Sequence, residues 1–525
     1  MSASGPLILT VDLGTSGPKV ALFDSNAKCI ADEFQEVPLL LYEHGGAEQR
    51  PADWINGIKS CYKKLISKSG IDPKRIVAVN CTAQWSGTVA LDKNGVPLMD
   101  SVIWMDTRGA EDVKELTHGP IRVEGYGVGK ILKWIRLTGG GPTKSGKDSI
   151  AHILYIKRAL PKIYEQTYKF LEPKDYLNLW LTGRFASSYD SITMHWVTDN
   201  RDINNIYYHD ELIRLSGVDK SKFPDLVPTN SVLGTVTNAI ADEFGLNRDV
   251  KVISGTPDVH SAAVGSGAVK DYEGHFYIGT SSWLVCHMPH KKTDMFHNMG
   301  TIPSGLPGRY LVANEQESAG ACLNFIKNNL LYHTDELGTG AAPKDFYKLV
   351  DKIADKVPAG SDGLYFLPCL YGERSPVDDH HVRGGFYNLS LNHNRTHMLR
   401  SVLEGVSLNG RWLLMYVEKL TGKRFEAINF IGGGANSAVW SQIIADVFNR
   451  PVRQMKEPLM SNSRGTAILA LMALKMMKID DVAKAVEVNK VFEPRHANGG
   501  LYDEMFGRFV EIYNKNKPIW MKLNN

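Results

Sequence analysis

The first apolar runs of the chain are short and closely spaced, which predicts strands rather than helices. Residues 7–11 and 20–23 are two such runs, and they flank a turn over residues 12–19. The turn contains glycine, threonine and serine, whose N–H and hydroxyl groups can approach an anion closely. This pattern predicts a β-hairpin that holds nucleotide phosphates, with Asp12 facing their metal ion. An ordinary glycine-rich β-turn is the alternative interpretation.

The same pattern recurs in the second half of the chain. Residues 276–278 and 283–286 are strand-like apolar runs, and the turn over residues 279–282 between them again consists of glycine, threonine and serine. Two copies are too few for a solenoid. They predict a pair of related domains that close on one nucleotide from two sides.

Other apolar patterns place helices between further strands. Residues 48–68 carry apolar side chains at helical spacing and predict a helix. Residues 76–80 and 250–257 predict buried strands of the kind found in α/β sheets. The small residues at 262–268 predict a tightly packed helix directly after the second of these strands.

The composition fits a globular protein of two domains. The 525 residues are too many for one hydrophobic core, and 43% are hydrophobic and 22% charged. A net charge of +3 gives no reason to expect nucleic acid, and no apolar stretch approaches the roughly 20 residues of a membrane helix. The six cysteines are scattered without a CxxC pair, which predicts buried thiols. Because the N-terminus does not resemble a secretory signal, we expect a cytoplasmic protein.

Polar and aromatic residues follow two of the predicted strands. Gln84 and Trp85 follow one strand, and Trp104, Asp106 and Arg108 follow another. The carboxyl ends of strands are where α/β folds bind their ligands. Amide and carboxylate groups can hydrogen-bond sugar hydroxyls, and an indole face packs against the C–H groups of a polyol. Two core tryptophans and a surface ion pair between Asp106 and Arg108 are the alternative.

A carboxylate and a triple glycine mark two further strand ends. Asp258 stands between a predicted strand and a predicted helix, which is the position of an N-cap residue. Gly432, Gly433 and Gly434 lead from a strand into a predicted helix at residues 440–448. Such a turn lets a flat adenine lie against the backbone near a helix N-terminus, although a tight turn without a ligand is the alternative.

Residues 141–147 match the spacing of a phosphate-binding P-loop but not its context. Lys147 ends the match, and Asp148 replaces the serine or threonine that a P-loop uses on magnesium. An amphipathic helix predicted at residues 131–137 precedes the match where a P-loop has a buried strand. We therefore predict an exposed glycine-rich loop.

Together these motifs resemble the FGGY carbohydrate kinases of the actin–Hsp70–hexokinase superfold, and most of all the xylulose kinases. The resemblance rests on residues 84–87, Trp-x-Asp-x-Arg at 104–108, Gly-x-x-Asp at 255–258, Gly-Glu-Arg-Ser-Pro at 372–376 and Gly-Gly-Gly-Ala-x-Ser at 432–437. It implies an α/β fold of two duplicated ribonuclease-H-like domains, of the actin/hexokinase type, with a cleft between them. The first domain would span residues 1–268 and the second residues 269–525.

The resemblance also implies what each motif does. The protein would bind ATP and Mg²⁺, with Asp258 as the general base and with Asp12 and Asp258 as the metal-side carboxylates. The sugar would contact Gln84, Trp85, Trp104, Asp106, Arg108 and Asp258. The nucleotide would contact Gly14, Thr15, Ser16, Lys19, Gly279, Thr280, Ser281, Gly320, Asn324, Gly433, Gly434 and Ser437.

The implied function is ATP-dependent phosphorylation of a small sugar or polyol, with a ketopentose such as D-xylulose as the first expectation. Another pentulose, glycerol and gluconate stay open, because Trp85 replaces the residue usual in xylulose kinases. A non-enzymatic nucleotide switch of the actin or chaperone kind is a further alternative, which Gln84 and residues 104–108 disfavour. The family also leads us to expect a homodimer, with no nucleic acid and no membrane as partners.

Overall fold

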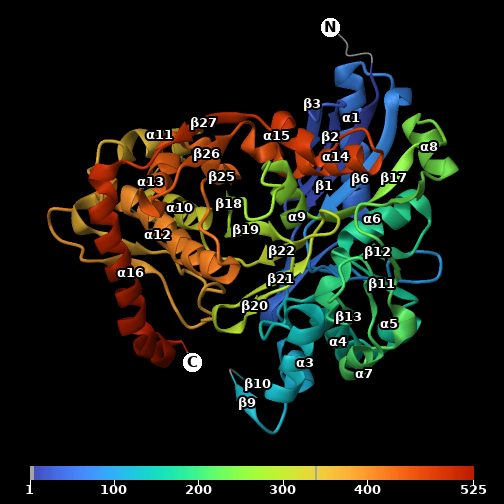
Figure 1. Ribbon diagram of the computed structural model, residues 1–525, viewed down its shortest axis with the longest axis horizontal. Coiled ribbons are helices and arrows are strands. Elements are labelled where there is room, and N and C mark those ends of the chain that lie inside the picture. The colour runs from blue at the N-terminus through green and yellow to red at the C-terminus, as the bar shows by residue number, and fades with distance from the viewer. Residues whose placement is uncertain (1–4, 124, 337–339, 525) are drawn as a thin grey trace.

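The computed structural model describes residues 5–123, 125–336 and 340–524. These residues form two halves, each built around one mixed sheet. Figure 1 shows the N-terminal elements, blue to green, on one side and most of the C-terminal elements, yellow to red, on the other. The two sheets take their strands from residues 7–257 and 274–492, and we propose that the two domains divide at residue 268.

The N-terminal sheet has a meander of three antiparallel strands, then two strands parallel to the first strand of the meander, and an antiparallel strand at the edge. Its strands, in spatial order, are β3 (Cys29–Phe34), β2 (Gly17–Phe23), β1 (Leu7–Gly14), β6 (Ile76–Ala83), β17 (Lys251–Pro257) and β16 (Val232–Thr235). Strands β1, β6 and β17 run parallel, and β16 is antiparallel to β17. The predicted hairpin over the first two strands is therefore present.

The C-terminal sheet repeats this order and adds two strands. Its strands are β20 (Thr293–Asp294), β21 (Met299–Pro303), β22 (Tyr310–Ala313), β19 (Ser282–Met288), β18 (Gly274–Ile278), β25 (Ile428–Ile431), β26 (Val452–Met455) and β27 (Val488–Phe492). Strands β18, β25 and β26 run parallel, as β1, β6 and β17 do. The predicted duplication of a ribonuclease-H-like sheet is confirmed by this shared order.

Helices cover both faces of the N-terminal sheet, which is why β1 is apolar without alternation. Its helices include α1 (Pro51–Ser69), α6 (Pro173–Thr182) and α9 (Asp258–Gly265), and α14 (Ser461–Ala473) joins them from the far end of the sequence. Leu7, Leu9 and Val11 pack with α1 and α6, whereas Ile8 faces the side of α9 and α14. Helix α1 begins at Pro51, because residues 48 and 49 of the predicted helix belong to the strand β5 (Gly46–Gln49) instead.

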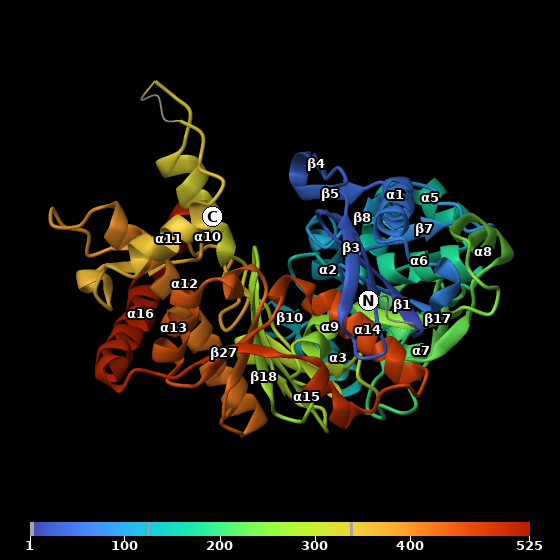
Figure 2. The ribbon, with the colours of Figure 1, turned by 90° about the horizontal axis from the view of Figure 1, so that it is seen from above.

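Helices α9 and α14 join the two halves (Figures 1 and 2). They cross in direct contact: a Cβ on Gly265 would lie 1.8 Å from the carbonyl oxygen of Ser461, and one on Gly465 would lie 1.8 Å from that of Ser261. One apolar cluster around them includes Ile253 of the N-terminal sheet together with residues of the C-terminal sheet. The core is therefore continuous from one sheet to the other.

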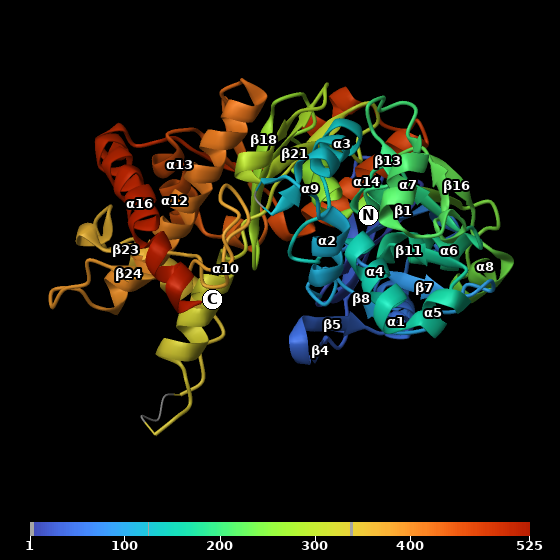
Figure 3. The same cartoon turned by 90° about the horizontal axis from the view of Figure 1, so that it is seen from below.

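The remaining helices belong to both halves of the molecule. They are α2 (Ala110–Thr117), α3 (Val128–Thr138), α4 (Ser149–Ala159), α5 (Pro161–Gln166), α7 (Asp210–Ser216), α8 (Asn238–Phe244), α10 (Gly320–Phe325), α11 (Phe346–Ala354), α12 (Arg395–Thr421), α13 (Ala438–Phe448), α15 (Val482–Ala485) and α16 (His496–Leu523). Figure 3 shows α3 beside the edge of the C-terminal sheet, where the Thr293 hydroxyl donates to the carbonyl oxygen of Gly139 at 2.7 Å. Within the described ranges, no helix combines the length and apolarity that crossing a membrane requires.

Short strands complete the N-terminal half and the loops. They are β4 (Leu40–Tyr42), β7 (Val89–Leu91), β8 (Ser101–Val102), β9 (Arg122–Val123), β10 (Tyr126–Gly127), β11 (Lys169–Leu171), β12 (Ala186–Ser188), β13 (Thr198–Asp199), β14 (Tyr207–Tyr208), β15 (Asp225–Val227), β23 (Tyr365–Leu367) and β24 (Gly385–Tyr387). The six cysteines are free thiols, and all except the partly exposed Cys29 are buried, in line with the sequence.

Candidate active site

The turn of the first hairpin lies at the carboxyl end of β1. Gly14 pairs with Gly17 to close it, which leaves Thr15 and Ser16 at its tip. Gly17 has a φ of +141°, and a Cβ there would lie 2.0 Å from the carbonyl oxygen of Gln35. Only glycine fits this position, and the tip presents the two hydroxyl residues that the sequence assigned to phosphates.

The turn of the second hairpin packs against the start of α10. The Gly279 carbonyl oxygen accepts the N–H of Gly320 at 2.9 Å, and the Gly279 N–H donates to the carbonyl oxygen of Ser281 at 2.9 Å. A Cβ on Gly320 would lie 2.3 Å from the oxygen of Gly279. The backbone at Thr280 accepts the N–H of Ala319 at 2.9 Å. Four residues predicted to bind the nucleotide therefore lie together at the end of β18.

The triple glycine packs on the same strand end. Gly432 has a φ of +85°, and a Cβ there would lie 2.5 Å from the carbonyl oxygen of Ile278. A Cβ on Gly434 would lie 2.8 Å from the Ile278 side chain, whereas one on Gly433 would meet nothing closer than 4.0 Å. The prediction named Gly433 and Gly434 and missed Gly432, although it begins the same run. The structure thus brings the triple glycine to the second hairpin.

Two further residues that the sequence predicts to bind the nucleotide, Asn324 and Ser437, form hydrogen bonds with side chains of α11. Ser437 is the N-cap of α13: it accepts the N–H of Trp440 at 2.9 Å and donates its hydroxyl to Asp351 at 2.6 Å. The exposed Asn324 accepts a hydrogen bond from the hydroxyl of Tyr347. Their contact with a nucleotide stays a prediction.

Asp258 is the first residue of α9 and follows β17 directly. The N-cap of α9 is Pro257, so the alternative in which Asp258 caps this helix is wrong. Burial raises the pKa of Asp258 to about 7, helped by the negative charges of Asp12 and Glu315 and opposed by the Val259 N–H, which donates to it at 2.8 Å. A carboxyl with this pKa can take up a proton near neutral pH.

Asp12 lies near the end of β1 with 8% of its surface exposed. Burial raises the pKa of its carboxyl, and the positive charge of Lys19, together with the nearby polar side chains of Asn462 and Ser463, opposes this rise. The Lys19 ammonium donates to the carbonyl oxygen of Leu459 at 3.0 Å. Lys19 therefore acts on the carboxylate side of the hairpin, and its predicted contact with phosphates stays a prediction.

Gln84 and Trp104 contact the tip of the first hairpin. The Thr15 hydroxyl donates to the Gln84 side-chain oxygen at 3.0 Å and accepts the Trp104 indole N–H at 2.9 Å. Gln49, which the sequence analysis placed in a helix, accepts the Gln84 amide at 2.7 Å and donates to the Thr15 carbonyl oxygen at 2.7 Å. Two predicted sugar residues and one predicted phosphate residue thus form one hydrogen-bonded group. Gln49 is fully buried, and because Glu48 and Arg50 flank it in a polar segment, no signal in the sequence singled it out.

Trp85 lies on a different side of the same loop. Its indole N–H donates to the carbonyl oxygen of Ser191 at 3.0 Å, and its ring meets the edge of His260 with ring centres 5.0 Å apart. Because His260 is two residues from Asp258, this contact places Trp85 next to the helix that carries the candidate base.

The sugar contact predicted for Asp106 is contradicted by its burial. Asp106 has no exposed surface, one of its oxygens accepts the Ala47 N–H and the Arg108 Nε at 2.8 Å each, and the other accepts the Arg108 N–H at 2.9 Å. Arg108 also donates to Glu48 at 2.5 Å and to the Tyr155 hydroxyl at 3.0 Å. These two residues hold the loop before α2, and the alternative of a surface ion pair is wrong as well.

Charged residues of the C-terminal half reach Trp104, and the sequence analysis did not select them. The Arg374 guanidinium lies 5.9 Å from the centre of the Trp104 ring and pairs with Glu315 and Glu317 at 2.5 Å each. Lys147 of the N-terminal half binds the same Glu317 at 3.1 Å. The Gly-Glu-Arg motif was the available signal for Arg374. Lys147 follows α3 rather than a strand, as the rejection of a P-loop required.

The two carboxylates Asp12 and Asp258 suit a divalent cation. Their negative charges act on the same region, since Asp12 raises the pKa of Asp258 and both carboxylates raise the pKa of Tyr277. Among the described residues, no group of three or more His, Cys, Asp or Glu side chains is arranged to hold a metal ion by itself. A Mg²⁺ ion at Asp12 would therefore take its other ligands from phosphate and water, as this ion commonly does.

Comparison with known families identifies both halves of the chain. Residues 7–265 match the N-terminal domain of the FGGY family of carbohydrate kinases, and residues 275–474 match its C-terminal domain. A xylulose kinase of Staphylococcus epidermidis is 28% identical over 98% of this chain and 97% of its own length. A gluconokinase of Bacillus subtilis is 26% identical over 96% of this chain and 95% of its own length.

The fold agrees with a solved structure of the same kind. The structure of ligand-bound xylulose kinase from Lactobacillus acidophilus superimposes with a TM-score of 0.86 at 24% identity, over 99% of this chain and 100% of that one. At this identity the likeness shows the fold. It supports the two-sheet arrangement that the strand order indicates.

Proposed function

The chain belongs to the FGGY family of carbohydrate kinases, and we propose that it transfers the γ-phosphoryl group of ATP to a hydroxyl of a neutral ketopentose such as D-xylulose. The position of Asp258 carries this proposal. Asp258 directly follows β17, and its carboxyl has a pKa near 7 that the negative charge of Asp12, at the first hairpin, helps to raise. Family membership also decides against a non-enzymatic nucleotide switch.

In the proposed mechanism Asp258 accepts the proton of the attacking hydroxyl. Phosphoryl transfer needs in-line positioning and stabilisation of charge more than covalent chemistry from the protein. Thr15, Ser16 and Thr280 would position the β- and γ-phosphates with the N–H groups of their turns. A bound Mg²⁺ on the Asp12 side would neutralise phosphate charge.

The sugar would lie between Gln84 and Trp104 on one side and Asp258 on the other. Gln84 can exchange hydrogen bonds with hydroxyls, and the Trp104 ring supplies an apolar face for C–H groups. Thr15 fixes both side chains, since it bonds to each of them. The same residue thereby ties the sugar side to the phosphate turn.

The charges around this space favour a neutral acceptor. Arg374 is held by Glu315 and Glu317, Lys147 by Glu317, and Lys19 by a backbone carbonyl. Asp12 and Glu315 add negative charge that raises the pKa of Asp258, and these carboxylates together with Asp258 would repel a carboxylate substrate. Gluconate is the second candidate, because a gluconokinase is nearly as similar to this chain as a xylulose kinase is.

A panel of acceptors tests the proposal. ATP turnover would be measured with D-xylulose, L-xylulose, D-ribulose, glycerol and gluconate, with Mg²⁺ present and with the Asp258→Asn variant as the control. We expect the highest kcat/KM with a ketopentose and at least about tenfold less with gluconate. Preferred turnover of gluconate would contradict the charge argument, and ATP hydrolysis independent of any acceptor would contradict the kinase reaction.

We also propose a homodimer, which light scattering would test.

A further inference from the structure

The strand that leads to Asp258 is not regular. Its register with β6 shifts between Ile253 and Thr256, so that two residues of β17 stand opposite one residue of β6. Gly255 in this bulge has a φ of +70°, and a Cβ there would lie 2.2 Å from the carbonyl oxygen of Cys81. A bulge changes the direction in which the following side chains point. The bulge therefore helps to decide where the Asp258 carboxylate is directed.

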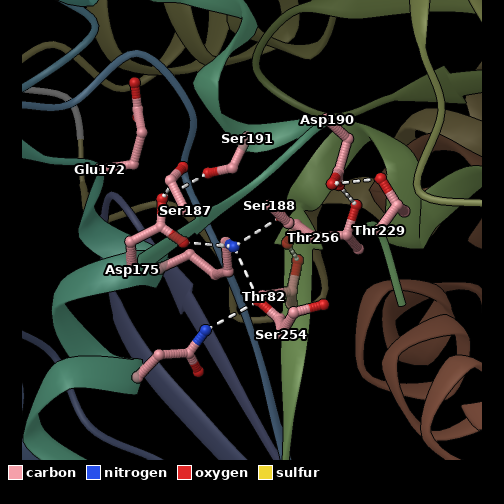
Figure 4. A network of polar contacts seen from close by, with 12 residues as sticks. Thr82, Glu172, Asp175, Ser187, Ser188, Asp190, Ser191, Thr229, Ser254 and Thr256 are labelled. Atoms are coloured by element: carbon pink, nitrogen blue, oxygen red, sulfur yellow. Dashed lines mark hydrogen bonds and ion pairs between the residues drawn. The ribbon is translucent and has the colours of Figure 1, made fainter. Parts of the chain in front are cut away.

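Helix α6 holds one side of this bulge. The Lys174 ammonium donates to the carbonyl oxygen of Ser254 at 2.7 Å, and the Asn178 amide donates to the same oxygen at 2.7 Å. Lys174 also donates to the Ser188 hydroxyl at 2.9 Å and pairs with Asp175 at 2.5 Å. Figure 4 shows Asp175, Ser188 and Ser254 converging on one ammonium nitrogen.

A buried carboxylate holds the other side. Asp190 accepts the Thr256 hydroxyl at 2.5 Å and the Thr229 hydroxyl at 3.0 Å (Figure 4). The Thr82 hydroxyl of β6 donates to the carbonyl oxygen of Thr256 at 2.8 Å. Both neighbours of Gly255 are thus fixed by side chains from other parts of the chain.

The burial of Lys174 calls for a reason. Only 1% of the residue is exposed, and removing an ammonium group from water is expensive unless each of its donors is used. Its three hydrogens match the three partners, a carbonyl oxygen, a hydroxyl and a carboxylate. An apolar side chain of similar length would cost less desolvation but could not bond to the Ser254 carbonyl oxygen.

The same helix start also reaches the sugar side. Glu172, the N-cap residue of α6, accepts the N–H of Gly87 at 3.0 Å and a hydrogen bond from the Ser149 hydroxyl. Gly87 ends the loop that carries Gln84 and Trp85. Residues 172–178 thus contact both the loop that carries Gln84 and Trp85 and the strand β17 that leads to Asp258.

We propose that Lys174 is a positioning residue for Asp258: by bonding to the Ser254 carbonyl oxygen it fixes the bulge that directs the base toward the acceptor hydroxyl. The proposal rests on the proposed function, in which Asp258 is the base. A purely structural lysine would stabilise the fold but would leave the rate of the chemical step unchanged in the folded enzyme.

Lys174→Met tests the proposal, and Arg400→Met is a matched control. Arg400 is a buried cation of the C-terminal half that bonds to a carboxylate (Glu404, 2.8 Å), a carbonyl oxygen (Ala354, 2.9 Å) and a hydroxyl (Tyr502, 3.4 Å). We expect Lys174→Met to lower kcat at least about tenfold with the KM values for sugar and ATP within about twofold, because a misdirected base slows chemistry without removing binding contacts. Arg400→Met should lower Tm and keep kcat within about twofold.

Hydrogen–deuterium exchange of residues 251–260 measures how often the bulged segment opens, and it needs no substrate. We expect faster exchange there in Lys174→Met than in the wild type or in Arg400→Met, because a freed bulge opens more often. Unchanged exchange, or a kcat no lower than that of Arg400→Met, would overturn the proposal. If the wild type phosphorylated no sugar, the proposed function would fail while the exchange result would still decide whether Lys174 fixes the bulge.

Asn178→Leu is the second variant, for the case in which Lys174→Met does not fold. It removes the other donor to the Ser254 oxygen and keeps the Lys174 ammonium. We expect the same local increase in exchange and a loss of kcat of about threefold, smaller because one donor remains. Wild-type exchange and wild-type kcat in a folded Asn178→Leu protein would count against the proposal.

Discussion

The hairpin β1–β2 has Asp12 two residues before its Gly-Thr-Ser turn, whereas the hairpin β18–β19 has Tyr277 at the equivalent position. Asp12 is a buried carboxylate near a second carboxylate, Asp258. Tyr277 stacks on Trp283, with ring centres 3.8 Å apart and planes 5° apart. The two hairpins therefore share their backbone arrangement, but a carboxylate stands in the first where an aromatic ring stands in the second.

The ends of the outer parallel strands differ in the same way. Strand β17 ends directly before Asp258, after a bulge to which the buried Lys174 bonds. The corresponding strand β26 ends before Lys456, whose ammonium pairs with Glu487 on the surface. Exposed pairs of this kind contribute little to stability. The polar groups that direct a reactive side chain are thus concentrated in the N-terminal half.

The C-terminal half contributes glycine turns instead. Gly279, Gly320 and Gly432 lie within contact distance of backbone or of Ile278 and Tyr277 at the end of β18. Close backbone approach suits a ligand that is recognised through N–H groups and a flat ring. We therefore propose that the N-terminal half supplies the general base and the first phosphate turn, and that the glycine turns of the C-terminal half supply the remaining nucleotide contacts.

The largest expected effect is that of Asp258→Asn, which removes the proposed base from the N-terminal half. Asparagine keeps the shape of the side chain but accepts no proton, so kcat should fall about 10²-fold or more while ATP and sugar still bind. Steady-state kinetics with separate binding titrations would measure this. Near-normal turnover in the folded variant would remove Asp258 from the mechanism.

Asp12→Ala should act through the metal ion. The Mg²⁺ concentration for half-maximal activity at fixed ATP should rise at least about tenfold, because the buried carboxylate on that side is lost. The KM for the sugar should stay near that of the wild type. An unchanged magnesium curve together with weaker sugar binding would show that Asp12 belongs to the sugar side.

Gly432→Ala tests the contribution of the C-terminal half. A Cβ 2.5 Å from the Ile278 oxygen at a φ of +85° forces the turn to move, so the KM for ATP should rise about fivefold with the sugar KM unchanged. Gly500→Ala is the matched control, since a Cβ there meets nothing within 4 Å and the residue lies in α16. Equal ATP kinetics in the two variants would contradict the assignment of this turn to the nucleotide.

Trp104→Ala should have the smallest effect on the kinetics. This residue lies where Arg374 of the C-terminal half approaches the N-terminal half. Loss of the ring face should raise the sugar KM about fivefold, in keeping with roughly 1 kcal/mol for aromatic packing. Trp180→Ala removes an indole that packs on Phe244 away from this space, and it should leave the sugar KM unchanged. A Trp104→Ala protein that only melts earlier would support the core-aromatic interpretation.

The sequence determined the features that depend on neighbouring residues. Apolar runs interrupted by Gly-Thr-Ser turns determined both hairpins, and the small residues after Asp258 determined α9. These patterns record local backbone requirements, such as the positive φ at Gly17 and Gly432, which only certain residues satisfy. The two-sheet duplication followed from the same local signals.

Only the tertiary structure decided which polar groups meet across the chain. Asp106 was assigned to the sugar but is saturated by Arg108 and Ala47, and Gln49 was placed in a helix but bonds to Gln84 and Thr15. Lys174 and Ser254 are 80 positions apart, and Lys147 and Glu317 are 170 apart. A buried donor must find an acceptor wherever packing places one, and the spacing of residues along the sequence carries no record of that partner.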